Sequence, residues 1–195
     1  MKLALLRHGP TDWNALGKIQ GQVDVPLSEA GLARMAALRL PFVASRLYAS
    51  PMLRTRQTAE ALGLKDPVLD ARLMEQNWGS WEGLTLAEIH SRHGANAFVE
   101  AGLGEAFRPG NGETTGELHA RVAAFLKDVA REESGAVAVT HLGVLRAAYT
   151  LATDWDMSTP MPADLDVSKI LVLSVSTDGK PAIETLNLDF NAKRA

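Results

Sequence analysis

The chain has 195 residues, 46% of them hydrophobic and 22% charged, with a formal net charge of -3 at pH 7. These proportions exclude a disordered or fibrous chain, and the charge lacks the basic excess of proteins that bind nucleic acid. No apolar run approaches the roughly 18 residues of a membrane span, and the absence of cysteine excludes disulfides and thiolate sites and favours the cytoplasm. With no internal repeat or linker, residues 1–195 are expected to form one domain, and the oligomeric state is left open.

Short apolar runs alternate with segments of helical pattern along the chain. We expect a strand at 2–6, a helix at 28–40, a strand at 46–49, helices at 53–62 and from 113 or 114 to 133, a strand at 136–140, a helix at 144–151, and strands at 170–175 and 183–188. Ser28 is expected to cap the first of these helices. The last two strands are expected to pair in antiparallel fashion through the turn at Asp178-Gly179.

Continuous apolar strands are typical of sheets that are buried on both faces. The alternation of strands and helices therefore predicts an α/β fold, a three-layer sandwich with a mainly parallel sheet covered by helices on both faces. Sheets of this kind place their sites at the carboxyl ends of the strands.

Two of the buried strands end in a histidine that a glycine follows within two residues: His8 with Gly9, and His141 with Gly143. A neutral imidazole is a nucleophile toward phosphorus, and glycine lets the backbone approach a ligand closely. A single loop histidine usually has no such role. Because the two contexts match, the two histidines are predicted to share one site.

Two arginines also lie at strand ends. Arg7 precedes His8, and Arg54 follows the strand predicted at 46–49. A guanidinium is a planar fork of donors that matches phosphate oxygens, so paired arginines beside a histidine indicate phosphoryl chemistry. Arg56, by contrast, is expected to be a solvated surface residue.

The segment Leu6-Arg7-His8-Gly9, with Thr11, Trp13 and Asn14, resembles the signature of the histidine phosphatase and cofactor-dependent phosphoglycerate mutase superfamily. Further segments resemble the family in the same order and together extend the resemblance over about residues 3–146: Gln20-Gly21 with Asp24, 26–28 and Gly31; Arg54 with 57–59; Glu75 with 79–83; Gly112-Glu113; Arg121; and Thr140-His141.

The resemblance implies that His8 attacks phosphorus and becomes a phosphohistidine, while Arg7, Arg54 and His141 hold the phosphoryl oxygens. It also implies that three further residues contact phosphate or substrate, namely Asn14, Gln20 and Gly21.

Glu75 matches the family's proton donor. An alkoxide leaves poorly, so the reaction needs a carboxyl group that protonates the leaving oxygen and then accepts a proton from water. Glu82 and Glu113 are the reserve candidates for this acid.

The predicted function is a metal-independent phosphomonoesterase that acts on a small phosphorylated metabolite and needs no cofactor. The first alternative is a phosphoglycerate mutase, but Glu75 leads directly into 79–83 without the inserted segment that mutases of this family carry. The second is a non-catalytic relative that binds phosphorylated ligands, which the intact set of catalytic residues disfavours. Nothing in the sequence identifies the physiological substrate.

His90 and His93 lie one helical turn apart, but a third metal ligand is not evident, so a solvated helix face is predicted there and no metal site. Three positions depart from the family pattern: Pro10 replaces a frequent Glu, and Leu142 and Asn111 each replace a frequent Gly. These departures bear on the substrate and not on the phosphohistidine step.

Overall fold

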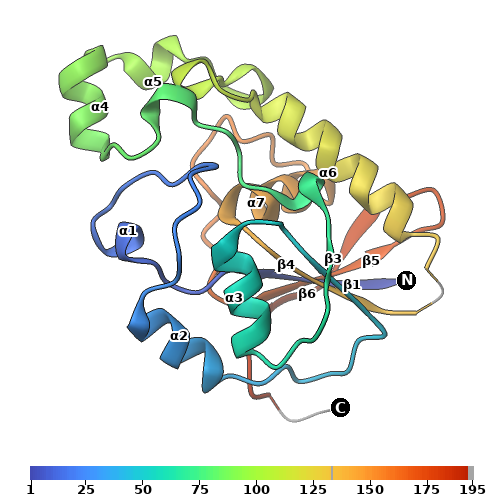
Figure 1. Ribbon diagram of the computed structural model, residues 1–195. Coiled ribbons are helices and arrows are strands. Elements are labelled where there is room, and N and C mark those ends of the chain that lie inside the picture. Colours follow the sequence, from blue (N-terminus) through green and yellow to red (C-terminus); the bar gives the residue numbers. More distant parts are fainter. Residues whose placement is uncertain (133, 193–195) are drawn as a thin grey trace.

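The computed structural model describes residues 1–132 and 134–192. Helices and strands alternate along most of the chain (Figure 1). In chain order the elements are β1 (Lys2–Arg7), α1 (Asp12–Ala15), α2 (Glu29–Ala36), β2 (Arg46–Ala49), α3 (Leu53–Ala61), β3 (Val68–Leu69), α4 (Leu86–His93), α5 (Ala97–Glu100), α6 (Thr115–Val129), β4 (Ala136–Thr140), α7 (Leu142–Leu151), β5 (Ile170–Val175) and β6 (Pro181–Leu188).

The strands form one sheet in the order β3-β2-β4-β1-β5-β6. The first four are mutually parallel, and β5 and β6 add an antiparallel pair at one edge. At the turn between β5 and β6, Gly179 has a φ of +87°, a conformation that glycine adopts without a steric penalty. The predicted α/β sandwich with a mainly parallel sheet is confirmed.

Alternate residues of the central strands serve two separate cores. Leu3 and Leu5 of β1 pack in the cluster that α6 and α7 cover, while Ala4 and Leu6 pack in the cluster that contains Met35 of α2. Figure 1 shows α6 and α7 on one face of the sheet and α2 and α3 on the other. Because both faces are covered, the interior positions of β1 and β4 are apolar on both sides, and Lys2, Arg7 and Thr140 lie only at the strand ends.

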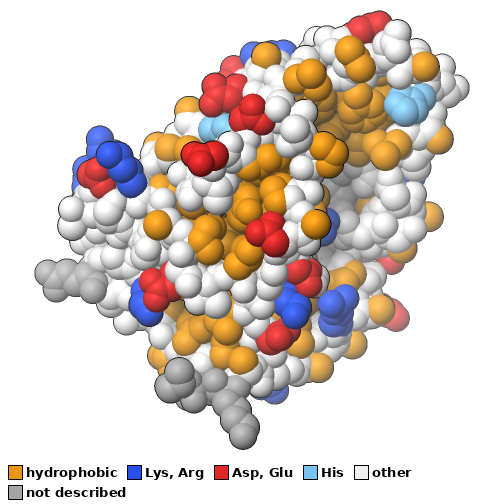
Figure 2. Space-filling model, turned by 180° about the vertical axis from the view of Figure 1, so that it is seen from behind, with side chains coloured by type: hydrophobic (Ala, Val, Ile, Leu, Met, Phe, Trp, Pro, Cys, Tyr) orange, Lys and Arg blue, Asp and Glu red, His pale blue; other side chains and the backbone are white. Residues whose placement is uncertain are grey.

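A third cluster lies outside the two central layers, around Trp81, Ile89 and Ala97. The ring of Trp81 lies 4.9 Å from that of Phe98, centroid to centroid, and this contact joins the loop before α4 to α5. The segment that contains α4 and α5, called the α4–α5 lobe below, projects from the body of the protein in Figure 1. Figure 2 shows hydrophobic and histidine side chains gathered at this end of the molecule. Within the described residues, no helix is long and apolar enough to cross a membrane.

The predicted helix at 28–40 begins as expected, since the Ser28 hydroxyl accepts the N–H of Gly31 at 3.0 Å. It ends earlier than predicted, at Ala36. Beyond it, the backbone of Arg39 pairs with Asn191 instead, through N–H to Oδ1 at 2.7 Å and through its carbonyl to the Asn191 N–H at 2.9 Å. A contact with the end of the chain therefore replaces the last helical turn.

The predicted helix that ends at 133 also stops sooner, at Val129, and Glu133 itself lies outside the described residues. Glu132 turns toward the sheet and accepts hydrogen bonds from Arg46 Nε and the Tyr48 hydroxyl at 3.2 and 3.3 Å. In α7 the difference is at the start, because the helix begins at Leu142, directly after His141.

Candidate active site

His8 lies just beyond the carboxyl end of β1, where its N–H still bonds the carbonyl of Thr140 at 2.9 Å. Its Nδ1 lies 2.7 Å from the Gly9 carbonyl. A carbonyl only accepts, so Nδ1 carries the proton and the lone pair of the neutral ring is at Nε2. Burial, reinforced by the positive charges of Arg54 and Arg7, lowers the pKa of His8 to about 3. At neutral pH the imidazole is therefore an uncharged nucleophile.

His141 lies at the carboxyl end of β4, next to His8, because β1 and β4 pair in parallel. The two ring centroids are 5.2 Å apart. Arg54 Nε donates to His141 Nδ1 at 3.3 Å, which leaves Nε2 as the protonated nitrogen, and Nε2 contacts the buried Ser50 hydroxyl at 2.9 Å. Both ring nitrogens thus have protein partners, and a direct contact from His141 to phosphate stays a prediction. Ser50 was not predicted as part of the site.

The Arg54 side chain is fully buried and anchors the loop that follows α1. Its two terminal nitrogens donate to the carbonyls of Gly21 at 2.7 Å and Val23 at 2.8 Å. The same loop carries Gln20, whose Oε1 is buried without a hydrogen-bond partner among the described residues. One side chain thus links the loop that contains Gln20 and Gly21 to His141.

Gly21 is needed where this loop meets Glu82. Its φ is +47°, and a Cβ at this position would overlap the Glu82 carboxylate. Glu82 Oε1 accepts the N–H groups of Gln22 at 2.8 Å and Trp78 at 3.0 Å. One reserve candidate for the acid therefore braces the loop.

Arg7 and Asn14 line a hollow of about 390 Å³ together with His8. Among the described residues, the Arg7 guanidinium has no hydrogen-bond partner and its Nε is buried. The Asn14 Oδ1 accepts the backbone N–H of Thr11 at 3.0 Å, which leaves its amide N–H groups available. The two side chains supply donors beside His8 of the kind that phosphate oxygens accept.

Glu75 reaches the start of α7. Its Oε1 accepts the N–H of Gly143 and the N–H of Gln76, both at 2.9 Å. A Cβ at Gly143 would overlap this carboxylate, so glycine is what permits the approach. Burial lowers the pKa of Arg7 and of Arg54, and the negative charge of Glu75 opposes this lowering at both residues. The charge of the predicted acid therefore acts on both predicted phosphate-binding arginines.

Arg121 of α6 holds the backbone around Glu75. It donates to the carbonyls of Arg72 at 2.6 Å and Glu75 at 3.1 Å, and it pairs with Glu113 through two contacts of 2.6 and 2.9 Å. The second reserve candidate for the acid is thus the ion-pair partner of Arg121. The family resemblance includes both residues but does not predict this contact.

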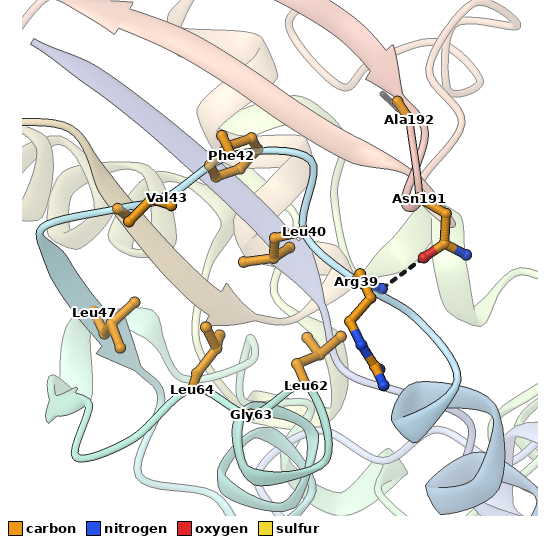
Figure 3. Close-up of a pocket in the computed structure, with 11 residues that line it drawn as sticks. Arg39, Leu40, Phe42, Val43, Leu47, Leu62, Gly63, Leu64, Asn191 and Ala192 are labelled. Atoms are coloured by element: carbon orange, nitrogen blue, oxygen red, sulfur yellow. Dashed lines mark hydrogen bonds between the residues drawn. The ribbon is translucent and has the colours of Figure 1, made fainter. Parts of the chain in front are cut away.

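A second hollow, of about 510 Å³, shares no lining residue with the hollow beside His8. Figure 3 shows that most of its lining side chains are apolar and that the Arg39–Asn191 hydrogen bond crosses one wall. It is formed by the segments around 39–47, 62–64 and 191–192. An apolar lining does not suit a phosphate dianion, so this hollow is not the site.

His90 and His93 face aromatic rings of the α4–α5 lobe. His90 lies 5.5 Å from Phe98 and His93 lies 5.9 Å from Trp81, centroid to centroid. Over the described ranges, no group of three His, Cys, Asp or Glu side chains is placed to hold a metal ion. That the reaction needs no metal stays a prediction.

The two buried histidines make the stability of the fold depend on pH. In the folded chain the pKa of His8 is lowered from the ordinary 6.5 to about 3, and the pKa of His141 is lowered well below 6.5. As the pH falls from about 6.5 toward 3, the unfolded chain binds protons at these positions and the folded chain does not. The free energy of unfolding should therefore fall by about 1.4 kcal/mol per pH unit for each histidine.

Urea unfolding between pH 7 and 4.5 checks this expectation. His8→Asn should reduce the slope of the unfolding free energy against pH by about 1.4 kcal/mol per pH unit, which corresponds to one proton. Equal slopes in wild type and His8→Asn would show that His8 is not held neutral in the folded chain.

The family model of the histidine phosphatase superfamily (branch 1) matches residues 3–189. The chain belongs to this superfamily. This histidine phosphatase is 32% identical over 186 residues to phosphoglycerate mutase-like protein 4 of Arabidopsis thaliana, a match that covers 90% of this chain and 77% of that protein. It is 32% identical over 169 residues to the metal-independent phosphoserine phosphatase of the same plant, covering 78% and 68%.

A solved structure of a mycobacterial glucosyl-3-phosphoglycerate phosphatase with VO3 superposes with a TM-score of 0.80. The match has 26% identity and covers 96% of this chain and 99% of that one. Together with the phosphatases among its relatives in sequence, this places the histidine phosphatase described here among the phosphatases by activity. The predicted family and enzyme class are confirmed.

Proposed function

We propose that the chain hydrolyses phosphomonoesters of small metabolites through a phosphohistidine on His8, without a metal ion or cofactor. In the first step His8 Nε2 bonds to phosphorus as the bond from phosphorus to the leaving oxygen breaks, and Glu75 gives its proton to that oxygen. In the second step water attacks phosphorus, Glu75 takes the proton from water, and the N–P bond breaks to release inorganic phosphate.

The observation that carries this proposal is the hydrogen bond of 2.7 Å between His8 Nδ1 and the Gly9 carbonyl. It fixes the proton on Nδ1, so the lone pair of Nε2 is available for attack. The low pKa of His8, about 3, keeps this form populated at neutral pH. A histidine with the opposite tautomer would carry its proton where the phosphorus has to bind.

The phosphoryl oxygens are proposed to bind Arg7, Arg54 and Asn14, with His141, Gln20 and Gly21 completing the pocket. Arg7 is the clearest of these, because its guanidinium is largely out of water with no protein partner among the described residues. A buried cation without a partner is costly, and a phosphate dianion would remove that cost. These fixed donors would stabilise the charge that a divalent ion stabilises in other phosphatases.

Glu75 is proposed as the acid because its Oε1 is held by two backbone N–H groups, which leaves Oε2 for the leaving oxygen. Glu113 is less suited, since both of its carboxylate oxygens bind Arg121. Glu82 Oε1 accepts two backbone N–H groups as Glu75 Oε1 does, and Glu75 is preferred because its charge acts on Arg7 as well as on Arg54. The curated relatives named for their substrates act on phosphoserine and on glucosyl-3-phosphoglycerate. A substrate of similar size is proposed here, and location in the cytoplasm stays a prediction.

The test is phosphate release from p-nitrophenyl phosphate, O-phosphoserine and 3-phosphoglycerate, measured with and without EDTA. We expect hydrolysis that EDTA does not change. A requirement for an added divalent ion would contradict the metal-independent mechanism. Interconversion of 3- and 2-phosphoglycerate without phosphate release would favour the mutase instead.

A further inference from the structure

A third hollow, of about 480 Å³, lies between the segment before α6 and the segment that follows α7. It shares no lining residue with the hollow beside His8. Gly104 lets its two walls approach each other, because a Cβ at this position would already lie 3.4 Å from the Asp156 carbonyl oxygen. The volume is one that small metabolites occupy in proteins. The fold therefore contains a concave site that the proposed reaction does not use.

Two buried polar atoms without partners belong to residues that line this third hollow. His119 of α6 is 5% exposed, and its Nε2 has no hydrogen-bond partner among the described residues. The Oγ1 of Thr150 in α7 is also buried without a partner there. Leaving such atoms unpaired is unfavourable, and folded proteins seldom do so. The pair therefore indicates a place where a ligand supplies the missing hydrogen bonds.

The surroundings of His119 show which kind of hydrogen bond is missing. Its Nδ1 lies 3.6 Å from Glu105 Oε1. Because a carboxylate only accepts, the ring proton is favoured on Nδ1, which leaves the lone pair on Nε2. Burial also lowers the pKa of His119, so the ring is neutral at neutral pH. The buried Nε2 is thus an acceptor that lacks a donor.

The charges around the third hollow are mainly negative. Three carboxylates line it, those of Glu105, Asp154 and Asp156, and its lining includes no lysine or arginine. Arg146, whose guanidinium lies 5.4 Å from the centroid of the Trp155 ring, balances at most one of these charges. An excess of negative charge in a concavity attracts cations and repels anions.

Trp155 forms an aromatic wall of the hollow and is held in a fixed position. Its Nε1 donates to Thr159 Oγ1 at 3.1 Å, and its ring meets that of Tyr149 edge to face at 6.0 Å between centroids. An indole ring provides apolar surface for methylene groups and attracts a cation at its face. The wall therefore suits an organic cation better than a strongly hydrated inorganic ion.

We propose that this hollow binds a small aliphatic amine, with a primary ammonium or guanidinium group as its cationic end. The N–H groups of the ligand donate to His119 Nε2 and Thr150 Oγ1, its charge is balanced by the carboxylates, and its methylene groups pack on Trp155. A metal ion is a poorer fit, because over the described ranges no three His, Cys, Asp or Glu side chains are placed to hold one. The inference stands independently of the proposed hydrolysis at His8.

The test is isothermal titration calorimetry of the full chain at low ionic strength with putrescine and agmatine. The matched control is 1,4-butanediol, which has the length of putrescine but carries hydroxyl groups in place of the ammonium groups. We expect saturable binding of at least one of the two amines at one molecule per chain, and none of the diol. In nitrogen NMR spectra, the ring signals of His119 should shift on addition of the amine.

Three variants and one control locate the site. His119→Phe removes the buried acceptor and should weaken binding about tenfold or more, as expected for a hydrogen bond to a charged group. Glu105→Gln changes an exposed residue, so the fold should be unaffected and binding should weaken about two- to fivefold. Trp155→Leu should also weaken binding. Glu60→Gln, an exposed carboxylate outside the hollow, should bind like the wild type.

The inference is wrong if neither amine binds more tightly than the diol, or if His119→Phe and Glu105→Gln keep wild-type affinity while thermal unfolding shows them folded. Binding of Mg²⁺ alone that Glu105→Gln weakens, without binding of either amine, would also overturn it. His8→Asn should lose hydrolysis of p-nitrophenyl phosphate and keep amine binding. Loss of amine binding in His8→Asn would place the cation at the catalytic site and contradict the inference, so the two proposals can fail separately.

Discussion

His8→Asn should lower phosphatase activity by roughly 10⁴-fold or more, because removal of a catalytic nucleophile typically has effects of this size. Asparagine has no basic nitrogen, so it cannot replace Nε2 as the attacking atom. The variant should fold, since the substitution removes a buried group that is costly to protonate and leaves the main-chain pairing of His8 with Thr140 in place. Phosphate release from p-nitrophenyl phosphate, with circular dichroism as the check on folding, measures the effect.

His93→Asn is the matched control for this prediction, because His93 is an exposed histidine that packs on the α4–α5 lobe. It should retain wild-type activity. If folded His8→Asn kept more than about a tenth of the wild-type rate, the nucleophile would have to be another group, and His141 would be the next residue to change.

Glu75→Gln should show an effect that depends on the leaving group. For an alkyl phosphate such as O-phosphoserine we expect a loss of about 10²- to 10⁴-fold in kcat/KM, which reports the steps up to departure of the alcohol; this is the usual contribution of a general acid. For p-nitrophenyl phosphate the loss in kcat/KM should be much smaller, because p-nitrophenolate leaves without being protonated, although kcat should fall as the second step slows. The amide oxygen of Gln still accepts the N–H groups of Gly143 and Gln76, so the site should keep its shape.

Two other variants show whether this dependence is specific to Glu75. Glu82→Gln and Glu113→Gln disturb carboxylates that brace a loop and pair with Arg121, so any loss should be similar for both substrates. An equal loss of kcat/KM on both substrates in Glu75→Gln would rule out Glu75 as the proton donor. A leaving-group dependence in Glu82→Gln would transfer the role to that residue.

Much of the fold could be predicted because the central strands are buried on both faces and so are apolar in their interior. Three of the five predicted strands have the predicted bounds. The α4–α5 lobe could not be predicted in the same way, because contacts between distant aromatic side chains such as Trp81 and Phe98 hold it together. Helix ends were misplaced where a long-range partner intervened, as Asn191 does at Arg39.

The proximity of His8 and His141 followed from their matching places at strand ends, and the structure confirms it with ring centroids 5.2 Å apart. Ser50 was missed because its contact with His141 joins residues that are 91 positions apart.

The measurement that tests the account most directly follows the phosphoryl group of a labelled substrate onto the enzyme. The reaction is stopped rapidly without acid, and the peptide that contains His8 is then examined by mass spectrometry. We predict a phosphoryl group on His8 that is stable to base and lost in acid, and that accumulates when the second step is slowed by Glu75→Gln with p-nitrophenyl phosphate as substrate. An active enzyme that carries no label on His8 at any time, or carries it on another residue, would contradict the proposed mechanism.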